Sequence, residues 1–221
     1  LREKGVGHML ETVPFPTGTV EVTLDGAGIP SYEIRQGVAW DNIPFTPQIE
    51  ELARHTRAAC FGSLAQRSPV SHRTIGRFLE TMPDGEGQYK VFDINLRQHF
   101  YTQQVVEESL RKCNILKIND EELAVVGSMF GMEGMQPGEQ CRTLLDRYGL
   151  RIVILTCGAA GSSVFAPDTR SYIPTPRVEV ADTVGAGDSF TASFLAALLS
   201  GLGIGEAHRL AVDVAAHVCS Q

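Results

Sequence analysis

The residues best suited to chemistry are Asp182–Phe190, which read Asp-Thr-Val-Gly-Ala-Gly-Asp-Ser-Phe. Gly185 and Gly187 permit backbone angles that other residues resist, and Asp188 and Ser189 are predicted N-caps of the apolar helix that follows. Such a turn directs backbone N–H groups into one concavity at the positive end of a helix dipole, a geometry that binds phosphate. A carboxylate there would repel phosphate unless it accepts a proton from an attacking hydroxyl. The segment therefore predicts phosphoryl transfer, and the simpler alternative is a glycine-rich turn capped by Asp188.

A second chemical cluster is Asn119-Asp120-Glu121-Glu122, placed after a predicted strand and at the start of a predicted helix. Residues three apart share one face of a helix, so Asn119 and Glu122 are expected to point the same way. An amide can contact phosphate, while a carboxylate can hold Mg²⁺ through water. The alternative is an acidic first turn that stabilises the helix dipole.

Glycines also follow the apolar run Ile152–Thr156, in the segment Thr156-Cys-Gly-Ala-Ala-Gly161. Glycines after a buried strand let the backbone approach a nucleotide closely. The segment differs from a Rossmann fingerprint because Thr156 occupies the strand end, and the sequence contains no Gly-Lys pair, which excludes a Walker A loop. A hairpin turn between Ile152–Thr156 and Ser163–Phe165 is the alternative, and both interpretations can hold together.

Asp93-Ile94-Asn95-Leu96-Arg97 forms a third candidate after a predicted strand. The Arg97 guanidinium could reach a triphosphate or an acidic sugar. A surface arginine that closes a loop is the alternative.

Short apolar runs that alternate with helical patterns would position these residues. This βαβα rhythm predicts a mostly parallel sheet covered by helices, in which ligands bind at the carboxyl ends of the strands. The predicted strands are Ala58–Phe61, Lys90–Ile94, Ile115–Ile118, Ile152–Thr156 and Ser163–Phe165. The predicted helices are Pro47–Thr56, Pro69–Met82, Gln103–Lys112, Asp120–Gly127, Pro137–Tyr148, Asp188–Leu199 and Ile204–Val218.

An antiparallel hairpin is expected nearer the start of the chain. Thr19–Leu24 and Ser31–Arg35 alternate apolar and polar residues around the turn signal Asp25-Gly-Ala-Gly28. This alternation predicts a two-stranded sheet with one covered face and one face that is wet or meets a ligand.

Composition limits the classes of protein that remain. The 221 residues carry a formal charge of −7, which argues against coating nucleic acid or an anionic membrane. No apolar stretch is long enough for a spanning helix and no signal-peptide pattern is present, so no membrane partner is expected. Five cysteines without a Cys-x-x-Cys pair predict a reducing, cytoplasmic location, and the six histidines show neither metal spacing nor a triad pattern.

The run Asp182–Phe190 closely resembles the C-terminal signature of the ribokinase (pfkB-type) family of carbohydrate kinases. The sequence pattern of the chain is most similar to that of the fructokinases in this family. The resemblance implies a three-layer α/β/α sandwich with a mostly parallel central sheet and a small β-sheet lid. It also implies that Gly185, Ala186 and Gly187 form the anion hole and that Asp188 is the catalytic base. Asp182 would lie near a monovalent cation, K⁺ in some members.

The other clusters match family motifs, and the resemblance gives them roles. Nucleotide-binding residues would be Asn119, Thr156, Gly158 and Gly161. Glu122 would hold Mg²⁺ through water, and Arg97 would contact the substrate or the triphosphate.

Three regions follow from the resemblance: residues 1–16 as a remnant of the N-terminal part of the α/β domain, residues 17–41 as the lid, and residues 42–221 as the nucleotide-binding and catalytic domain. Arg35 and Asp41, at the lid edge, are candidate substrate contacts. Where fructokinases often carry Tyr-Arg-Gly, this sequence has Arg35-Gln36-Gly37, which weakens that assignment. The exposed edge of the hairpin suggests a homodimer formed through the lid.

The resulting hypothesis is an ATP-dependent kinase that phosphorylates a hydroxyl of a small sugar, fructose or a related one, with Mg²⁺. Alternative acceptors are ketodeoxygluconate or a nucleoside, and a catalytically inactive sugar- or nucleotide-binding protein is the alternative from another class. The family's N-terminal Gly-Gly motif, its early aspartate and its last loop are not found in these 221 residues, so the chain is expected to be a piece of a longer protein.

Overall fold

A computed structural model describes residues 2–24, 30–179 and 181–221. The turn predicted at Asp25–Gly28 lies outside the described residues. Contacts divide the chain into two compact units, one of Leu1–Thr56 and Leu64–Pro83, the other of Arg57–Ser63 and Asp84–Gln221. The division predicted at residues 16 and 41 stays a prediction.

The larger unit is built on a six-stranded sheet with the order β3-β4-β5-β6-β7-β8. The first four strands pair in parallel, whereas β7 and β8 add antiparallel strands at one edge. The parallel strands therefore all end at one edge of the sheet, where ligands bind in such folds. The strands are β3 (Ala58–Phe61), β4 (Tyr89–Asp93), β5 (Ile115–Asn119), β6 (Ile152–Thr156), β7 (Ser162–Ala166) and β8 (Thr169–Ile173).

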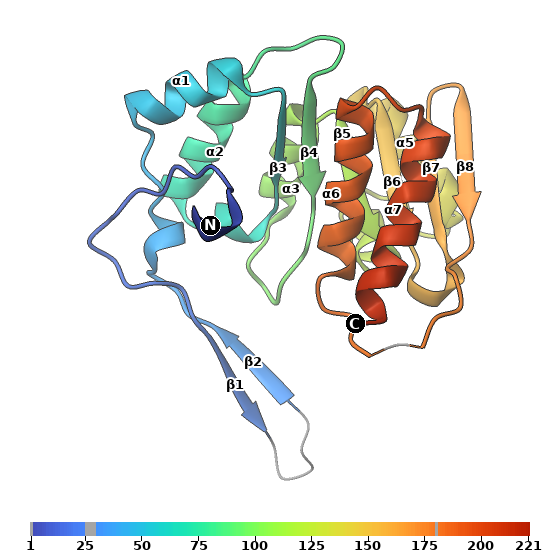
Figure 1. The fold of residues 1–221 in the computed structure, drawn as a ribbon, viewed down its shortest axis with the longest axis horizontal. Helices are drawn as coiled ribbons and strands as arrows, with labels where there is room; N and C mark the ends of the chain where they lie inside the picture. Colours follow the sequence, from blue (N-terminus) through green and yellow to red (C-terminus); the bar gives the residue numbers. More distant parts are fainter. Residues whose placement is uncertain (1, 25–29, 180) are drawn as a thin grey trace. The chain divides into compact units, whose positions relative to one another are not determined.

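Helices cover both faces of this sheet, which confirms the predicted α/β/α sandwich (Figure 1). The helices of one face are α3 (Gln103–Lys112), α4 (Asp120–Met129) and α5 (Pro137–Tyr148), and those of the other are α6 (Ala186–Leu199) and α7 (Ile204–Cys219). Two separate hydrophobic cores fill the space between the layers.

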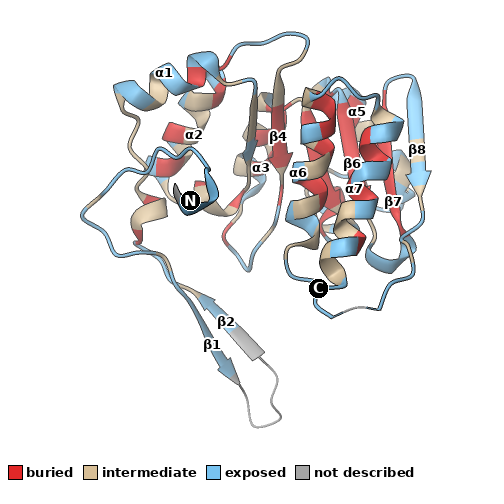
Figure 2. Ribbon diagram, viewed as in Figure 1, coloured by how far each residue is buried: buried red, intermediate tan, exposed pale blue. Residues whose placement is uncertain are grey.

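Alternate residues of a central strand serve the two cores. In β4, Phe92 packs under α3 and α4, while its neighbour Val91 packs under α6 and α7. In β5, Leu116 packs in the same core as Phe92, and Ile115 packs in the same core as Val91. Both faces are therefore dry, as the red strands of Figure 2 show, and this explains why the strand sequences are continuously apolar. Burial of each such side chain stabilises the unit by about 1.5–3 kcal/mol.

The smaller unit contains the hairpin of β1 (Val20–Leu24) and β2 (Pro30–Ile34), the 3-10 helices η1 (Arg2–Lys4), η2 (Ala39–Asp41) and η3 (Leu64–Gln66), and the helices α1 (Pro47–His55) and α2 (Pro69–Thr81). Helix α1 begins where the sequence signals predict, because Thr46 accepts a hydrogen bond from the Ile49 N–H and Pro47 occupies the first turn.

The hairpin presents two chemically different faces. Cross-strand pairing places Val20 opposite Ile34 and Val22 opposite Tyr32, which gives one apolar face. The other face carries Glu21 directly opposite Glu33. Val20, Val22 and Tyr32 are each more than half exposed, at 53%, 56% and 56%. The predicted alternation is confirmed, but the prediction that one face is covered is wrong, because the apolar face is exposed.

The predicted elements are confirmed within two residues at each end, and one observed strand was not predicted. Strand β8 is absent from the predicted set, because Thr169–Ile173 is a largely exposed edge strand without a continuous apolar run. Helix α6 begins at Ala186, two residues before the predicted start. Among the described residues, no helix is both long and apolar enough to cross a membrane.

Candidate active site

One cavity of about 1290 Å³ lies at the carboxyl ends of the strands of the larger unit. Asp93, Arg97, Asn119, Glu122, Thr156 and Asp188 all line it, together with the glycines that follow β6 and precede α6. These segments are far apart in the sequence, and the parallel strands bring their ends to one edge. The cavity therefore unites every cluster that the sequence singled out in this unit.

The start of α6 forms the anion-binding turn. Gly185 is the N-cap, with a φ of +83° that favours glycine. The Ala186 N–H donates to the Thr183 carbonyl at 3.2 Å. For the N–H groups of Gly187 and Asp188 the described chain provides no acceptor, so these two donors are available to an anion.

The predicted capping role of Asp188 and Ser189 is wrong, because both residues lie inside the first turn of α6. Asp188 is instead an exposed carboxylate beside the available N–H groups, in the same cavity. The explanation offered for Gly187 also changes, since its backbone is helical and not left-handed. A side chain at Gly187 would place its Cβ 3.3 Å from the Lys117 Nζ, so close packing is what favours glycine there.

Glu122 joins two of the loops around the cavity. Its Oε2 accepts the Asn119 N–H at 3.0 Å, and the Asn119 Oδ1 accepts the Glu122 N–H at 2.8 Å, which is a capping box at the start of α4. Its Oε1 accepts the Leu96 N–H at 2.9 Å, from the loop after β4. The side chain is buried, so Glu122 fixes the positions of both loops.

The loop after β4 is held in an uncommon conformation. Asn95 and Gln98 have positive φ angles of 46° and 49°, a region that few residues other than glycine occupy. Arg97 lies between them, lines the cavity, and donates to the Leu96 carbonyl at 3.1 Å. Such strain persists only where surrounding contacts enforce it, and it is concentrated at functional sites.

The loop between β6 and β7 makes a tight turn at the edge of the cavity. The Cys157 N–H donates to the Gly161 carbonyl at 2.8 Å, and the Thr175 hydroxyl donates to the Gly158 carbonyl at 2.5 Å. Gly161 has a φ of +108°, and a Cβ there would lie 2.6 Å from the Ile173 carbonyl oxygen. Because β6 and β7 pair antiparallel, the predicted hairpin turn is confirmed.

Comparison with known proteins now identifies the family. The family model described as pfkB family carbohydrate kinase matches residues 70–221, which include the whole cavity. The chain belongs to the pfkB family of carbohydrate kinases.

Individual relatives agree with this membership and differ in the acceptor that they name. A fructokinase of Rhizobium leguminosarum is 30% identical over 160 residues, which cover 69% of this chain and 46% of that protein. A nucleoside kinase of Methanothermobacter thermautotrophicus is 27% identical, with 81% and 54% covered. The chain thus spans about half the length of these relatives.

A solved structure shares the fold. A sugar kinase of Pyrococcus horikoshii, determined in complex with ATP, superposes with a TM-score of 0.75 at 23% identity, covering 96% of this chain and 67% of that one.

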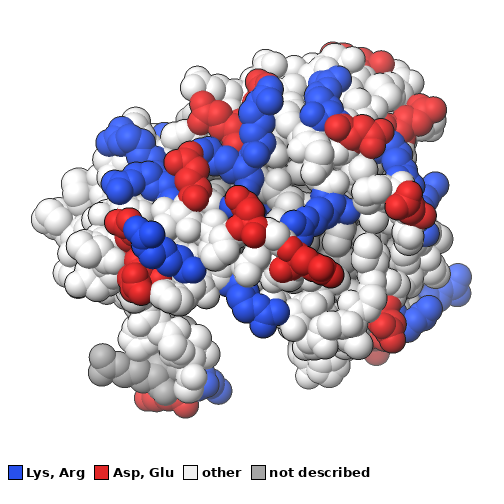
Figure 3. Space-filling model, turned by 90° about the horizontal axis from the view of Figure 1, so that it is seen from above, with Lys and Arg blue, Asp and Glu red and all other residues white. Residues whose placement is uncertain are grey.

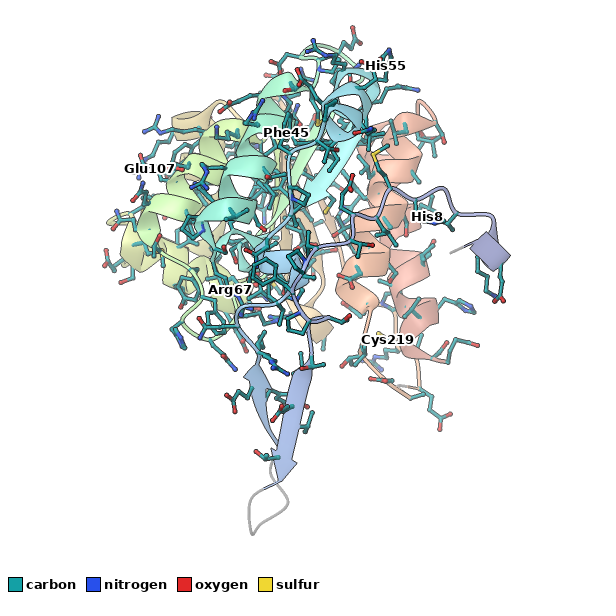
Figure 4. The ribbon with its side chains drawn as sticks, turned by 90° about the vertical axis from the view of Figure 1, so that its left-hand side faces the viewer. His8, Phe45, His55, Arg67, Glu107 and Cys219 are labelled. Carbon is teal, nitrogen blue, oxygen red and sulfur yellow. The ribbon has the colours of Figure 1, made fainter. Side chains whose placement is uncertain are left out.

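Two of the candidate residues of this pfkB chain lie in the smaller unit. The Asp41 carboxylate is buried and accepts from the Arg67 Nε and Nη2 at 2.8 and 2.9 Å. The Arg67 Nη2 also donates to the Arg35 carbonyl at 2.5 Å, and Figure 4 shows Arg67 at the base of the hairpin. Burial raises the pKa of the Asp41 carboxyl, but the Arg67 guanidinium and the Val38 N–H outweigh it and hold that pKa below its usual value. Asp41 is thus engaged in anchoring the hairpin.

Asp182 precedes the anion-binding turn of the pfkB signature. It is exposed, and its Oδ1 accepts the Val184 N–H at 2.9 Å, which shapes the chain just before Gly185. Asp182 is not among the residues that line the cavity, although Thr183 and Val184 are.

Lys117 is a cavity residue that the sequence analysis missed. It is the one charged residue of β5, whose sequence is Ile-Leu-Lys-Ile-Asn. A lone lysine in a continuously apolar strand was the available signal, because burying an ammonium without a partner is costly.

Proposed function

We propose that this chain is the catalytic part of an ATP-dependent kinase that phosphorylates a hydroxyl of a small sugar, fructose or a related one. One observation carries the proposal. Asp188 stands in the same turn as the two N–H groups of Gly187 and Asp188 that have no acceptor in the described chain, so a base and an anion-binding group meet in one cavity. Membership in the pfkB family supports it.

In the proposed reaction, Asp188 accepts the proton of the attacking hydroxyl as its oxygen bonds to the γ-phosphorus. The bond between that phosphorus and the bridging oxygen breaks, and ADP leaves. The Gly185–Ala186–Gly187 turn presents the available N–H groups of Gly187 and Asp188, and these two donors stabilise the negative charge on the phosphoryl oxygens. Groups that are already oriented at such a position contribute most to the rate.

The nucleotide would lie along the loops that follow β5 and β6, beside Asn119, Thr156, Gly158 and Gly161, with Arg97 near the phosphates. A relative with the same fold was determined with ATP. The net charge is −7, and Figure 3 shows acidic and basic side chains interspersed over the face in view. Attraction of an anionic nucleotide must therefore come from local groups.

The residues present fit a Mg²⁺ ion that is held mainly by phosphates and water. Glu122 has both carboxylate oxygens engaged by backbone N–H groups, so it would act on the ion through water. No cluster of three His, Cys, Asp or Glu able to hold a metal by itself occurs in the described part of the chain. When bound, Mg²⁺ supplies charge neutralisation to the triphosphate.

Asp182 is the proposed neighbour of a monovalent cation such as K⁺. Its carboxylate shapes the segment directly before Gly185, so a cation there would stabilise the anion-binding turn. Replacing KCl by tetramethylammonium chloride at constant ionic strength is therefore expected to lower kcat.

The decisive experiment is an ADP-release assay of the protein with a panel of fructose, other small sugars, ketodeoxygluconate and nucleosides. We expect turnover with one acceptor and a loss of at least about 10³-fold in kcat for Asp188→Asn, the scale of removing a general base. Acceptor and ATP binding should persist in that variant. Nucleotide binding without turnover on any acceptor would instead identify a catalytically inactive binding protein.

The proposal includes a homodimer formed through the hairpin. The exposed apolar face of Val20, Val22 and Tyr32 is a surface that a second hairpin could cover. Sedimentation should then show a dimer for the native protein and a monomer for Val22→Glu. Glu21→Gln, on the opposite face, is the matched control and should remain dimeric.

A further inference from the structure

Lys117 belongs to a buried charged network that reaches the anion-binding turn. Its Nζ lies 3.1 Å from the Asp93 Oδ1, and the two residues are directly paired in the parallel register of β4 and β5. The Asp93 Oδ2 accepts from the Thr191 hydroxyl at 2.8 Å, and that hydroxyl is also 3.1 Å from the Gly187 carbonyl oxygen. The network thus connects two strands to the first turn of α6.

The ammonium group lies directly beside the anion-binding turn. The Lys117 Nζ is 3.3 Å from the position that a Cβ of Gly187 would occupy, and Lys117, Gly187 and Asp188 line the same cavity. An ammonium has three N–H donors. Within the described chain, the Nζ has one hydrogen-bond acceptor, Asp93, so two donors remain for a ligand in the cavity.

Stability alone does not account for this pair. The side chains of Lys117 and Asp93 are only 11% and 13% exposed, so both charges have lost most of their water. Desolvation of two ions commonly outweighs their mutual attraction, and apolar residues of similar size are often as stable. Lys90 is also a buried lysine, but its partner Asp84 is 85% exposed and keeps its hydration.

We propose that Lys117 is a catalytic residue that donates hydrogen bonds to the oxygens of the transferring phosphoryl group, and that Asp93 and Thr191 are positioning residues that hold it under the α6 turn. This inference rests on the proposed kinase function and deepens it. During transfer, the acceptor O–H proton goes to Asp188, the new O–P bond forms, and the bond to ADP breaks. Lys117 neither gains nor loses a proton and contributes only charge and hydrogen bonds.

The test compares Lys117→Met with Lys90→Met in the protein that carries this chain. Both variants remove a buried lysine that is paired with an aspartate. Lys90 lies at the amino end of β4, whereas Lys117 lies on the neighbouring strand β5, level with the carboxyl end of β4. We expect Lys117→Met to lower kcat by about 10²-fold or more, the scale of losing one oxyanion donor, with the KM for the acceptor within about threefold. Lys90→Met should lower the melting temperature while kcat stays within about threefold.

A restored charge separates electrostatic stabilisation from packing. Lys117→Arg should recover at least about tenfold of the kcat that Lys117→Met loses, because a guanidinium also donates to phosphoryl oxygens. Equal kcat losses in Lys117→Met and Lys90→Met, or a Lys117→Met enzyme within about threefold of the native kcat, would overturn the proposal.

A binding measurement keeps this inference separable from the kinase proposal. Affinity for ADP alone and for ADP with aluminium fluoride, an analogue of the transferring phosphoryl group, can be measured by calorimetry without turnover. Lys117→Met should bind ADP alone with the affinity of the native protein. The increase in ADP affinity that aluminium fluoride causes should be at least about tenfold smaller in Lys117→Met than in the native protein. An unchanged gain contradicts the role of Lys117, whereas absence of turnover by the native protein on every acceptor contradicts only the kinase function.

Discussion

The two ends of the central sheet treat polar groups differently. At the amino ends, the Asn114 side chain accepts the Lys90 N–H at 2.9 Å and donates to the Gln88 carbonyl at 3.0 Å, and the Lys90 ammonium reaches the exposed Asp84. At the carboxyl ends, Asp93, Lys117 and Glu122 are charged groups with little water, and they surround a cavity. At the amino ends the buried Lys90 ammonium thus has an exposed partner, whereas at the carboxyl ends both side chains of the Asp93–Lys117 pair are buried.

The non-glycine residues with a positive φ in the described chain both lie at the carboxyl edge. They are Asn95 and Gln98, in the loop after β4, at +46° and +49°. A non-glycine residue in such a conformation costs on the order of 1–3 kcal/mol. The edge that lines the cavity therefore also carries the non-glycine strain and an ion pair in which both side chains are buried.

Among the variants that compare the two edges, Glu122→Ala at the carboxyl edge is expected to have the largest effect. The change leaves the N–H groups of Asn119 and Leu96 without their acceptor and removes the carboxylate proposed to act on Mg²⁺. We expect kcat/KM for ATP to fall by about 10²-fold and stability to fall by about 2–3 kcal/mol, measured by steady-state kinetics and urea unfolding.

Glu139→Ala is the matched control, because Glu139 forms the corresponding capping box at the start of α5 without lining this cavity. It should cost about 1 kcal/mol and leave kcat/KM within about twofold. If Glu139→Ala lowered kcat/KM as much as Glu122→Ala, a capping glutamate that lines the cavity would not differ in effect from one outside it, and the comparison would be wrong.

Gly161→Ala is expected to have the second-largest effect. Its Cβ would lie 2.6 Å from the Ile173 carbonyl oxygen, so the β6–β7 loop must move. Stability should fall by about 2–4 kcal/mol through strain and overpacking, and the KM for ATP should rise, because this loop borders the proposed nucleotide site.

Gly149→Ala provides the comparison for Gly161. Gly149 also has a positive φ, +61°, but nothing lies within 4 Å of its Cβ position. The alanine variant should lose only about 1 kcal/mol and keep its KM for ATP. A rise in KM in both variants would show that global destabilisation, and not the loop, controls nucleotide binding.

The elements that depend on local pattern were predictable from the sequence. Strand β6 and helix α5 begin and end at the predicted residues, because continuous apolar runs and helical periodicity specify them. The start of α6 was not predictable in this way, since Asp188 and Ser189 are also common N-caps and the left-handed Gly185 is visible only in the backbone. Local signals therefore locate an element better than they locate its first residue.

The site shows the same limit. The cavity contains the predicted clusters of the larger unit. Those after β4, β5 and β6 meet because parallel strands share one edge, and the start of α6 joins them although no strand directly precedes it. Lys117 was missed because its partner Asp93 is 24 residues away in sequence and becomes its neighbour only through the register of β4 and β5. Pairs that depend on register are invisible to motif spacing.

Asn114→Ala tests the amino edge and should have a smaller effect. It removes the two side-chain hydrogen bonds that join the starts of β4 and β5. Stability should fall by about 2 kcal/mol, and kcat and both KM values should stay within about twofold after correction for the folded fraction. A kcat loss of tenfold would contradict the expectation that these hydrogen bonds affect stability alone.

The smallest effect concerns His208 on α7, a buried group that joins the carboxyl edge to β8. One ring nitrogen lies 2.8 Å from the Ser162 hydroxyl, which lines the cavity, and the other lies 2.8 Å from the Ser171 hydroxyl. Burial, with a smaller contribution from the charge of Arg209, lowers the pKa of His208 to about 4.

Between pH 6.5 and about 4, the unfolded His208 binds a proton that the folded one does not, so the free energy of unfolding must fall as pH falls through this range. We expect a loss of about 1–2 kcal/mol from this group, measured by urea unfolding at several pH values. His208→Gln should remove that part of the slope, whereas His55→Gln, on the exposed surface of α1, should leave it unchanged. Over the same pH range, the KM for ATP of the folded native protein should stay constant, because the folded His208 remains neutral there. If the free energy of unfolding of His208→Gln depended on pH as that of the native protein does, other groups would cause the acid sensitivity. The hydrogen bonds of His208 would then not distinguish the carboxyl edge from the amino edge.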